Sequence, residues 1–339
     1  MRVLITGGCG FLGSNIARDM VDRGHEVLVF DNLSRTGAAT NLSWLQDGGS
    51  VRYSHGDIRN PSDVERVVLS FAPEAVFHLA GQVAMTTSLA DPRLDFDTNA
   101  LGSFLLLDAL RRLRPDCVVL YSSTNKVYGD LEWIRYEEND SRYFAPDYPN
   151  GFPETLPFDP ESPYGVSKGS ADTYMRDFHR MYGLRTVVFR HSSMYGGRQF
   201  ATYDQGWIGW FAQKTLEAAK GSTEVVTVSG TGKQVRDVLH AADIVSLYAT
   251  ALEHADRLAG EAFNVGGGMD NSLSLLELFA LLKSQTGATL NLRHIEARRS
   301  DQRVFVADNQ KVQTATGWRP AVSKEEGIAR TLGWLSGAK

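Results

Sequence analysis

The sequence of 339 residues is poor in cysteine, in blocks of like charge and in long apolar runs. Its two cysteines, Cys9 and Cys117, form no CxxC or zinc-type spacing, so we expect a reduced, cytoplasmic protein with no bound metal. The net charge of −5 and the lack of a Lys/Arg-rich block argue against a nucleic-acid surface. The apolar run at residues 1–6 stops at a glycine, too soon for a signal peptide or a membrane span.

The first 190 residues alternate between the patterns of strands and helices. We expect strands at 3–6, 26–30, 51–54, 75–78, 117–122 and 185–190, and helices at 11–23, 95–113 and 164–182. This alternation predicts an α/β fold with a doubly wound parallel sheet, the Rossmann arrangement.

The alternation breaks down after residue 190, which indicates a second, smaller unit. We expect a dinucleotide-binding domain at 1–190, with a return segment at about 236–262. A C-terminal substrate-binding domain would combine 191–235 and 263–339. The segment 130–161, rich in proline, acids and aromatics, interrupts the first domain. A loop of this length is usually functional or mobile, so it either borders the site or packs as a surface excursion without ligand contact.

A glycine-rich turn joins the first expected strand to the first expected helix. Gly7, Gly10 and Gly13 have the spacing GxxGxxG, with Phe11 and Leu12 between the last two. Such a turn lets the backbone approach a pyrophosphate at the N-terminus of a helix. The strand before it and the helix after it therefore predict a dinucleotide site.

Asp31, followed by Asn32 at the end of the second strand, predicts the coenzyme. A carboxylate there accepts hydrogen bonds from ribose hydroxyls and repels a 2′-phosphate, which favours NAD over NADP. Arg35 nearby could instead stabilise a phosphate. The next two strands would add contacts to the adenine from Asp57 and Ile58, and to the nicotinamide half from Leu79, Ala80 and Gly81. We expect His78 to be a satisfied histidine at a strand end rather than a catalytic group.

Tyr164 and Lys168 lie four residues apart on an expected helix, so their side chains share one face. An ammonium beside a phenol favours the phenolate and lowers a pKa that is normally about 10. Tyr164 would then accept a proton from a sugar hydroxyl that loses hydride. Because the chain holds 12 tyrosines, this spacing also arises by chance, and its meaning depends on the nicotinamide site around it.

Together these motifs resemble the extended short-chain dehydrogenase/reductase superfamily, the nucleotide-sugar epimerases and dehydratases. The likeness covers essentially the whole chain, through residues 6–13, 31–33, 78–81, 99, 121–129, 164–168, 195–199 and 236–243. It implies tightly bound NAD, with Thr124 on the reacting hydroxyl, Tyr164 as base and then acid, and Lys168 on the nicotinamide ribose. It also implies coenzyme contacts from Asn99 and Ser122, and a homodimer or homotetramer built on the helices at 95–113 and 164–182.

Further segments, at 123–129, 189–211, 232–240 and 300–303, resemble the members that epimerise a CDP-dideoxyhexose at C2 for O-antigen-type sugar assembly. This likeness implies a nucleotide-diphosphate sugar, preferably a CDP-sugar, that passes through a 2-keto form. It also implies substrate contacts from Arg198, Gln199, Gln205, Trp207, Arg236 and Arg298. Arg236 and Arg298 match arginines that grip the diphosphate. A surface ion pair for each arginine and a core position for Trp207 are the alternatives.

Asn125 and Lys126 separate epimerisation from elimination. The related 4,6-dehydratases carry Asp-Glu after the threonine, because loss of water needs an acid and a base. Asn125 cannot titrate and Lys126 has the opposite charge, so a dehydratase is disfavoured. A UDP-hexose 4-epimerase, which shares the generic residues, is the main alternative. A cofactor-sensing regulator on the same fold would be expected to lose the Tyr164 and Lys168 pair.

Overall fold

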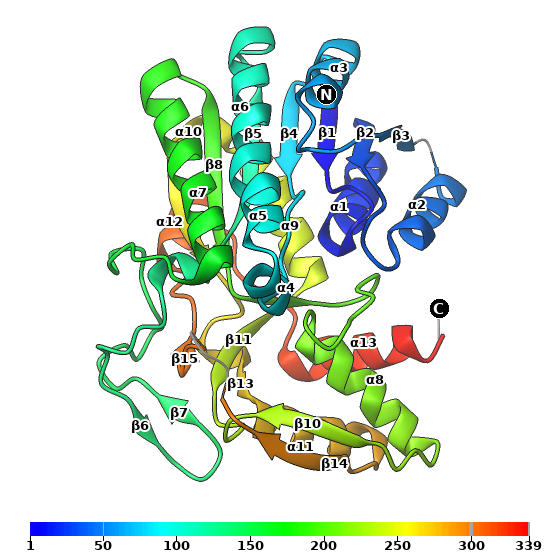
Figure 1. The fold of residues 1–339 in the computed structure, drawn as a ribbon, viewed down its shortest axis with the longest axis vertical. Helices are drawn as coiled ribbons and strands as arrows, with labels where there is room; N and C mark the ends of the chain where they lie inside the picture. Colours follow the sequence, from blue (N-terminus) through cyan, green and yellow to red (C-terminus); the bar gives the residue numbers. More distant parts are fainter. Residues whose placement is uncertain (50, 298–300, 338–339) are drawn as a thin grey trace.

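The computed structural model describes residues 1–49, 51–297 and 301–337. Its centre is a seven-stranded sheet of order β12-β8-β5-β4-β1-β2-β3, in which every neighbouring pair is parallel (Figure 1). The strands are β1 (Arg2–Thr6), β2 (Glu26–Asp31), β3 (Val51–His55), β4 (Ala75–His78), β5 (Val118–Thr124), β8 (Arg185–His191) and β12 (Ala262–Val265). The predicted doubly wound α/β fold is confirmed: the strand expected at 75–78 matches β4, and the other five expected strands differ from the observed ones by at most two residues at either end.

Helices cover both faces of the sheet because alternate side chains of a strand point to opposite sides. On one face Ile5 packs with Ile16, and on the other Leu4 packs with Val67. The first face carries α1 (Phe11–Asp22), α2 (Ala38–Asp47), α9 (Ala241–Glu253), α10 (Ala255–Leu258) and α12 (Gln310–Thr316), and the second carries α3 (Pro61–Phe71), α6 (Gly102–Leu113) and α7 (Ser162–Tyr182). Within the described residues, no helix combines the length and the apolar character needed to cross a bilayer.

The single helix expected at 95–113 is interrupted in the structure. After the short α4 (Met85–Ala90), α5 (Pro92–Phe96) ends where a π-helical turn, Asp97–Leu101, begins, and α6 follows. A π-turn is wider than an α-turn and is frequent at functional sites. Asn99 lies in this turn, and its amide donates to the carbonyl of Gln82 at 2.9 Å and to the hydroxyl of Ser167 at 3.1 Å. The wide turn therefore links the segment after β4 to α7.

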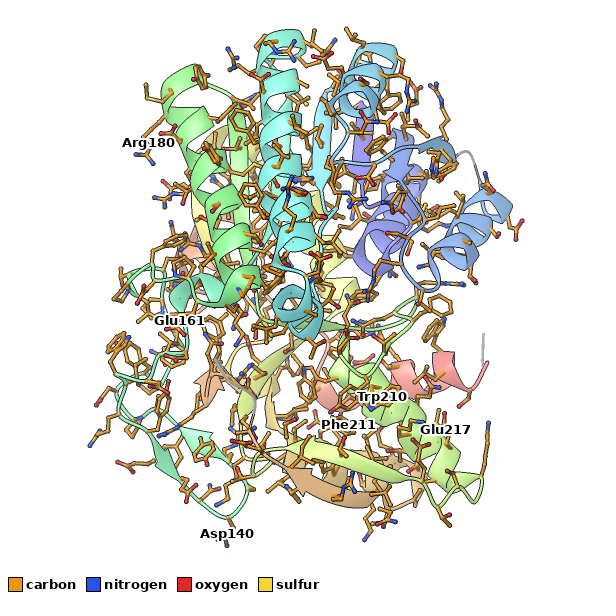
Figure 2. The ribbon with its side chains drawn as sticks, in the orientation of Figure 1. Asp140, Glu161, Arg180, Trp210, Phe211 and Glu217 are labelled. Atoms are coloured by element: carbon orange, nitrogen blue, oxygen red, sulfur yellow. The ribbon has the colours of Figure 1, made fainter. Side chains whose placement is uncertain are left out.

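The C-terminal elements build a smaller unit below the carboxyl ends of the central strands (Figure 1). One small sheet contains β9 (Ser193–Tyr195), β11 (Val235–His240), β13 (Ser272–Ser274) and β15 (Val304–Phe305), and another pairs β10 (Val225–Ser229) with β14 (Asn291–Ile295). Three helices pack around them: α8 (Trp207–Ala219), α11 (Leu275–Thr286) and α13 (Lys324–Leu335). Phe211 lies on α8 (Figure 2), and its ring meets that of Phe279 on α11 edge to face, with the ring centroids 4.9 Å apart. β12 returns from this region to the edge of the central sheet beside β8.

The segment 130–161 packs onto the C-terminal elements. It contains a small hairpin, β6 (Glu137–Glu138) and β7 (Tyr143–Phe144), with Asp140 in the connecting turn (Figure 2). Arg142 donates to the Glu277 carboxylate at 2.7 Å, and the ring of Phe152 lies 5.6 Å from that of Phe305 on β15. The segment is therefore a packed excursion with its own apolar contacts.

Candidate active site

A cleft of about 440 Å³ lies at the carboxyl ends of the central strands, between β1 and β4. The chain runs from β1 to β2 on one side of this point and from β4 to β5 on the other, so the strand order reverses here. Its wall contains most of the predicted coenzyme contacts: Gly7, Gly10, Phe11, Leu12, Gly13, Asp31, Asn32, Asp57, Ile58, Leu79, Ala80, Gly81 and Ser122. Asn99 and Lys168 lie beside this wall, since Asn99 accepts from the Gln82 amide at 2.9 Å and Lys168 donates to the Ser122 carbonyl. The structure thus brings the separate motifs to one place.

The glycine turn leaves no room for a side chain at Gly7 or at Gly13. Gly7 has φ +68, and a β-carbon there would lie 2.7 Å from the backbone nitrogen of Ala80. A β-carbon on Gly13 would lie 2.3 Å from the carbonyl oxygen of Gly7. α1 begins directly after Gly10, and among the described residues no side chain caps its first amides. These amides and the helix dipole suit an anionic group such as a pyrophosphate.

Asp31 lies at the rim of the turn with one lone pair of each oxygen already engaged. Oδ2 accepts from the amide of Cys9 at 3.0 Å, and Oδ1 accepts from the amide of Leu33 at 2.7 Å. Burial raises the pKa of Asp31, and these two hydrogen bonds oppose that rise. Each oxygen keeps a lone pair for a ribose hydroxyl. Together with the glycine turn, this carboxylate fits NAD.

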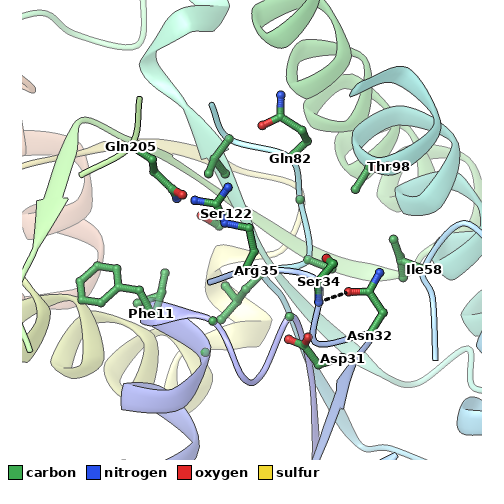
Figure 3. Close-up of a pocket in the computed structure, with 18 of the residues that line it drawn as sticks. Phe11, Asp31, Asn32, Ser34, Arg35, Ile58, Gln82, Thr98, Ser122 and Gln205 are labelled. Atoms are coloured by element: carbon green, nitrogen blue, oxygen red, sulfur yellow. Dashed lines mark hydrogen bonds between the residues drawn. The ribbon is translucent and has the colours of Figure 1, made fainter. Parts of the chain in front are cut away.

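Arg35 extends from the loop after β2 across the cleft towards Gln205 on the opposite wall (Figure 3). Burial lowers the pKa of Arg35, and the charge of Asp204 acts in the opposite direction. A guanidinium in this place offers a charge-assisted partner for a phosphate inside the cleft.

Thr124, Tyr164 and Lys168 meet where β5 ends and α7 begins. Thr124 is the last residue of β5, and its hydroxyl accepts from the Lys126 amide at 3.2 Å. Tyr164 is in the first turn of α7. The ammonium of Lys168 lies 4.4 Å from the ring centroid of Tyr121 and is almost fully buried.

The prediction that Lys168 lowers the pKa of Tyr164 is wrong for this structure. Burial raises the pKa of Tyr164 to about 12, a hydrogen bond with Thr124 opposes the rise, and the charge of Asp95 adds to it. Burial also lowers the pKa of Lys168 to about 7, against the charges of Asp95 and Asp172. The same low-dielectric surroundings disfavour both the phenolate and the ammonium.

His78 is the satisfied histidine that the sequence predicts. Its ring is fully buried, with Nδ1 2.7 Å from the Thr6 hydroxyl and Nε2 2.8 Å from the Ser103 hydroxyl. Burial, together with the charge of Lys168, lowers the pKa of His78 to about 3. The ring is therefore neutral at physiological pH.

Asp95 is a site residue that the sequence analysis missed. It is fully buried and accepts from the Gln82 amide at 3.0 Å and from the Ser167 hydroxyl. Its charge favours the ammonium form of Lys168. The cleft wall also contains residues that were not predicted as contacts: Ser34, Thr36, Asn41, Gln82, Val83, Thr87, Leu94, Thr98, Met194 and Phe200. Met194 and Phe200 lie within the segment 189–211, and Ser34, Gln82 and Thr98 each directly adjoin a motif residue, so extending the motifs could have added these five.

Three of the predicted substrate contacts, Arg198, Gln199 and Gln205, line the coenzyme cleft itself. The guanidinium of Arg198 lies 4.2 Å from the centroid of the Trp44 ring, and the carbonyl oxygen of Arg198 accepts from Asn41 at 3.2 Å. These contacts place Arg198 beside α2, on the coenzyme side of the molecule.

The other predicted substrate contacts belong to the C-terminal elements. Arg236 on β11 pairs with Asp301 at 2.6 Å and is mostly buried, so it is no surface ion pair. Trp207 donates to the Ser193 hydroxyl at 3.1 Å and packs at the edge of the smaller core. Arg298 lies outside the described residues. Within those residues there is no group of three or more His, Cys, Asp or Glu side chains able to hold a metal ion.

Comparison with known proteins places this fold and site in a family. Residues 4–331 match the family model described as GDP-mannose 4,6 dehydratase. The chain therefore belongs to the NAD-dependent nucleotide-sugar epimerases and dehydratases of the extended short-chain dehydrogenase/reductase superfamily.

Its relatives include one at high identity. The chain is 54% identical to CDP-paratose 2-epimerase of Salmonella typhi, with 99% of each chain covered. Among solved structures it is similar to UDP-glucose 4-epimerase of Thermotoga maritima with UDP-glucose, at 31% identity, TM-score 0.85 and 99% of each chain. It is also similar to UDP-glucose 4-epimerase of Thermus thermophilus in complex with NAD, at 30% identity, TM-score 0.82 and 100% of each chain.

Proposed function

We propose that the protein converts CDP-paratose to CDP-tyvelose by inverting C2 of the sugar. The observation that carries this proposal is the 54% identity, from end to end, to CDP-paratose 2-epimerase. The UDP-glucose 4-epimerases share the fold at a much lower identity, 31% and 30%. The site supports the same chemistry because a coenzyme cleft ends beside Thr124, Tyr164 and Lys168.

Each of these residues has a role that its position allows. Thr124 donates to or accepts from the reacting hydroxyl, and Tyr164 removes its proton and later returns it to the ketone oxygen. NAD, held by the glycine turn and Asp31, would supply the acceptor for the hydride that leaves C2 and the donor for its return to the opposite face of the sugar. Lys168 would hold the nicotinamide ribose, and in this structure its charge does not lower the pKa of Tyr164. In the structure the phenol is the stable form at neutral pH, so proton removal by Tyr164 requires a cation close to its oxygen.

Elimination is not supported by the residues next to Thr124. The Asn125 amide is nearly buried and donates to Gln302 at 2.8 Å, so it offers no proton. Burial and the neighbouring charge of Arg236 lower the pKa of Lys126 to about 8, which leaves it mainly cationic at neutral pH. A 4,6-dehydratase needs an acid and a base here. The residues present therefore suit a reaction in which no water leaves.

The direct test is NMR of CDP-paratose incubated with the purified protein. We expect the C2 proton signal of a second epimer, at an equilibrium ratio reached from either side, with no net release of reduced coenzyme. If UDP-galactose is converted as fast as CDP-paratose, the protein is instead a UDP-hexose 4-epimerase. A 4-keto-6-deoxy product would indicate a dehydratase.

We infer that two copies pair through α6 and α7. Both helices carry large apolar side chains on the surface, among them Phe104 on α6 and Tyr174, Met181 and Tyr182 on α7, which are 37%, 42%, 67% and 55% exposed. The rings of Phe104 and Tyr174 lie 5.3 Å apart, so they form one patch. Such patches commonly mark protein interfaces. Light scattering should show a dimer or tetramer that Tyr174→Glu dissociates, and an unaltered assembly in this variant would contradict the pairing.

A further inference from the structure

A buried glutamine joins the turn after β5 to the C-terminal segment. Gln302 is fully buried, and both ends of its amide are used. Asn125 donates to its Oε1 at 2.8 Å, and its Nε2 donates to the carbonyl oxygen of Gly129 at 2.6 Å. Burying amides is costly unless every polar atom finds a partner. The two bonds therefore fix Gln302 firmly against the turn that follows Thr124.

The segment around Gln302 also contacts Arg236, the arginine that is expected to bind the diphosphate. Asp301 pairs with Arg236 at 2.6 Å, and the Arg303 carbonyl accepts from the Val235 amide at 2.9 Å. The next residues form β15, which pairs with β11 and sets Phe305 opposite Arg236. A continuous set of short contacts therefore runs from Thr124 through Asn125, Gln302 and Asp301 to Arg236.

We propose that Asn125 and Gln302 are positioning residues that set the separation between the diphosphate anchor, Arg236, and the reacting group at Thr124 and Tyr164. This inference rests on the proposed function, because Arg236 is the diphosphate contact that the resemblance to the CDP-sugar epimerases implies. The separation matters for which carbon reacts: C2 is bonded to the anomeric carbon that carries the diphosphate, whereas C4 lies across the ring. A displacement of about 1 Å at a site can cost a factor of 100 in rate.

The pair also explains why an amide suits position 125. Gln302 already donates to Gly129, so it presents its oxygen to residue 125, and only a donor can meet that oxygen. A carboxylate at 125 would place two acceptors face to face beside Tyr164. Asn125 stands where the 4,6-dehydratases carry an acid. It thus has a second role, because it holds the segment around Gln302 in place.

The test is CDP binding by calorimetry to the NAD-loaded protein. Gln302→Met keeps the size of the side chain and removes both hydrogen bonds, and we expect CDP to bind at least about tenfold more weakly, with turnover lost more strongly than binding. Gln285→Met is the matched control, because Gln285 is exposed on α11 and donates only to the Glu325 carbonyl. Retained NAD and a single cooperative thermal transition would show that the variants are folded, although the midpoint of Gln302→Met should be lower because two buried partners lose their hydrogen bonds.

A second variant, Gln302→Glu, tests whether CDP binding depends on pH, which a purely structural role of Gln302 would not predict. Burial raises a carboxyl pKa, and the protonated acid accepts from Asn125 and donates to Gly129 as the amide does. Relative to the unaltered protein at each pH, CDP binding should approach normal near about pH 6 and weaken towards about pH 8 as this carboxyl ionises. Asp301→Asn with Gln302→Met should weaken binding by less than the product of the single effects, because both act through Arg236.

The outcomes separate this inference from the proposed function. If folded Gln302→Met binds CDP within about twofold of the unaltered protein, or Gln302→Glu shows no pH dependence, the positioning role is overturned. If CDP binding responds as expected while CDP-paratose is not epimerised at C2, the positioning role stands and the substrate assignment fails. If the unaltered protein binds no CDP, both are overturned.

Discussion

Replacing Asp172 with asparagine should lower the free energy of unfolding by about 3–5 kcal/mol. Asp172 lies on α7 one turn after Lys168 and is fully buried. Its two oxygens accept from the Arg190 guanidinium at 2.8 and 2.9 Å, and the Ser123 hydroxyl donates to the same carboxylate at 2.9 Å. Burial alone would lower the pKa of Arg190, but the hydrogen bonds and charge of Asp172 raise it. Asparagine would leave that guanidinium charged and uncompensated in a low-dielectric interior.

A second ion pair on β8 is the control. Arg185 donates to Asp256 at 2.7 Å, but the side chains are 36% and 84% exposed, so Asp256→Asn should cost no more than about 1 kcal/mol. Urea unfolding of the NAD-saturated protein measures both variants. Combining Asp172→Leu with Arg190→Met should recover part of the loss, because no buried charge is left without a partner. A cost of less than about 1 kcal/mol for Asp172→Asn, or one equal to that of Asp256→Asn, would refute the reasoning.

Three further predictions concern the site and the response to pH. Tyr164→Phe should reduce turnover by a factor of about 100–10,000 while NAD stays bound, measured by NMR assay and by coenzyme content after denaturation; near-normal turnover would remove Tyr164 from the mechanism. Asp31→Asn should weaken NAD binding by about 1.5–3 kcal/mol through loss of charge-assisted bonds to ribose, and unchanged retention of NAD on dialysis would contradict that role. Burial, together with the Lys168 charge, lowers the pKa of His78 and His191 to about 3. Because the unfolded chain binds their protons from about pH 6.5 downwards, stability should fall as the pH drops from about 6.5 towards 3, by about 1.4 kcal/mol per pH unit for each ring. Urea midpoints that do not change between about pH 7 and pH 5 would contradict this assignment.

Sequence patterns correctly predicted those parts of the molecule whose structure depends on residues close by in the chain. The glycine turn and Asp31 could be read in sequence because a strand, a turn and a helix follow one another there. The expected helix at 164–182 begins only two residues early in the structure, at Ser162, and ends at Tyr182 as expected. The π-turn at Asp97–Leu101 was missed because the hydrogen bonds that accompany it, from Asn99 to Gln82 and Ser167, join residues 17 and 68 positions apart.

The charge states of the site could not be read from spacing. The spacing of four residues correctly places Tyr164 and Lys168 on one side of α7, but it does not show how deeply the two side chains are buried. Burial reverses the expected direction for Tyr164, whose pKa rises to about 12. Asp95 was missed for a related reason, since its partner Ser167 is far away in the sequence. Gln302 lies in the segment 300–303 that carries part of the resemblance, but its contact with Asn125 could not be foreseen from sequence. The roles assigned to Arg198 and Gln205 stay predictions, because both line the coenzyme cleft.

β12 has a consequence for how the chain is made. Its residues 262–265 form the outer strand of the central sheet and cover β8, which neighbours the strand that ends at Thr124. Until the ribosome has passed residue 265 of 339, β8 is an unpaired edge, and such edges invite pairing with other chains. A chain cut after residue 190 would keep the glycine turn and the Tyr164 and Lys168 pair, yet it would expose this edge and aggregate. β8 therefore gains its outer partner only after the residues of the Tyr164 and Lys168 pair have been made.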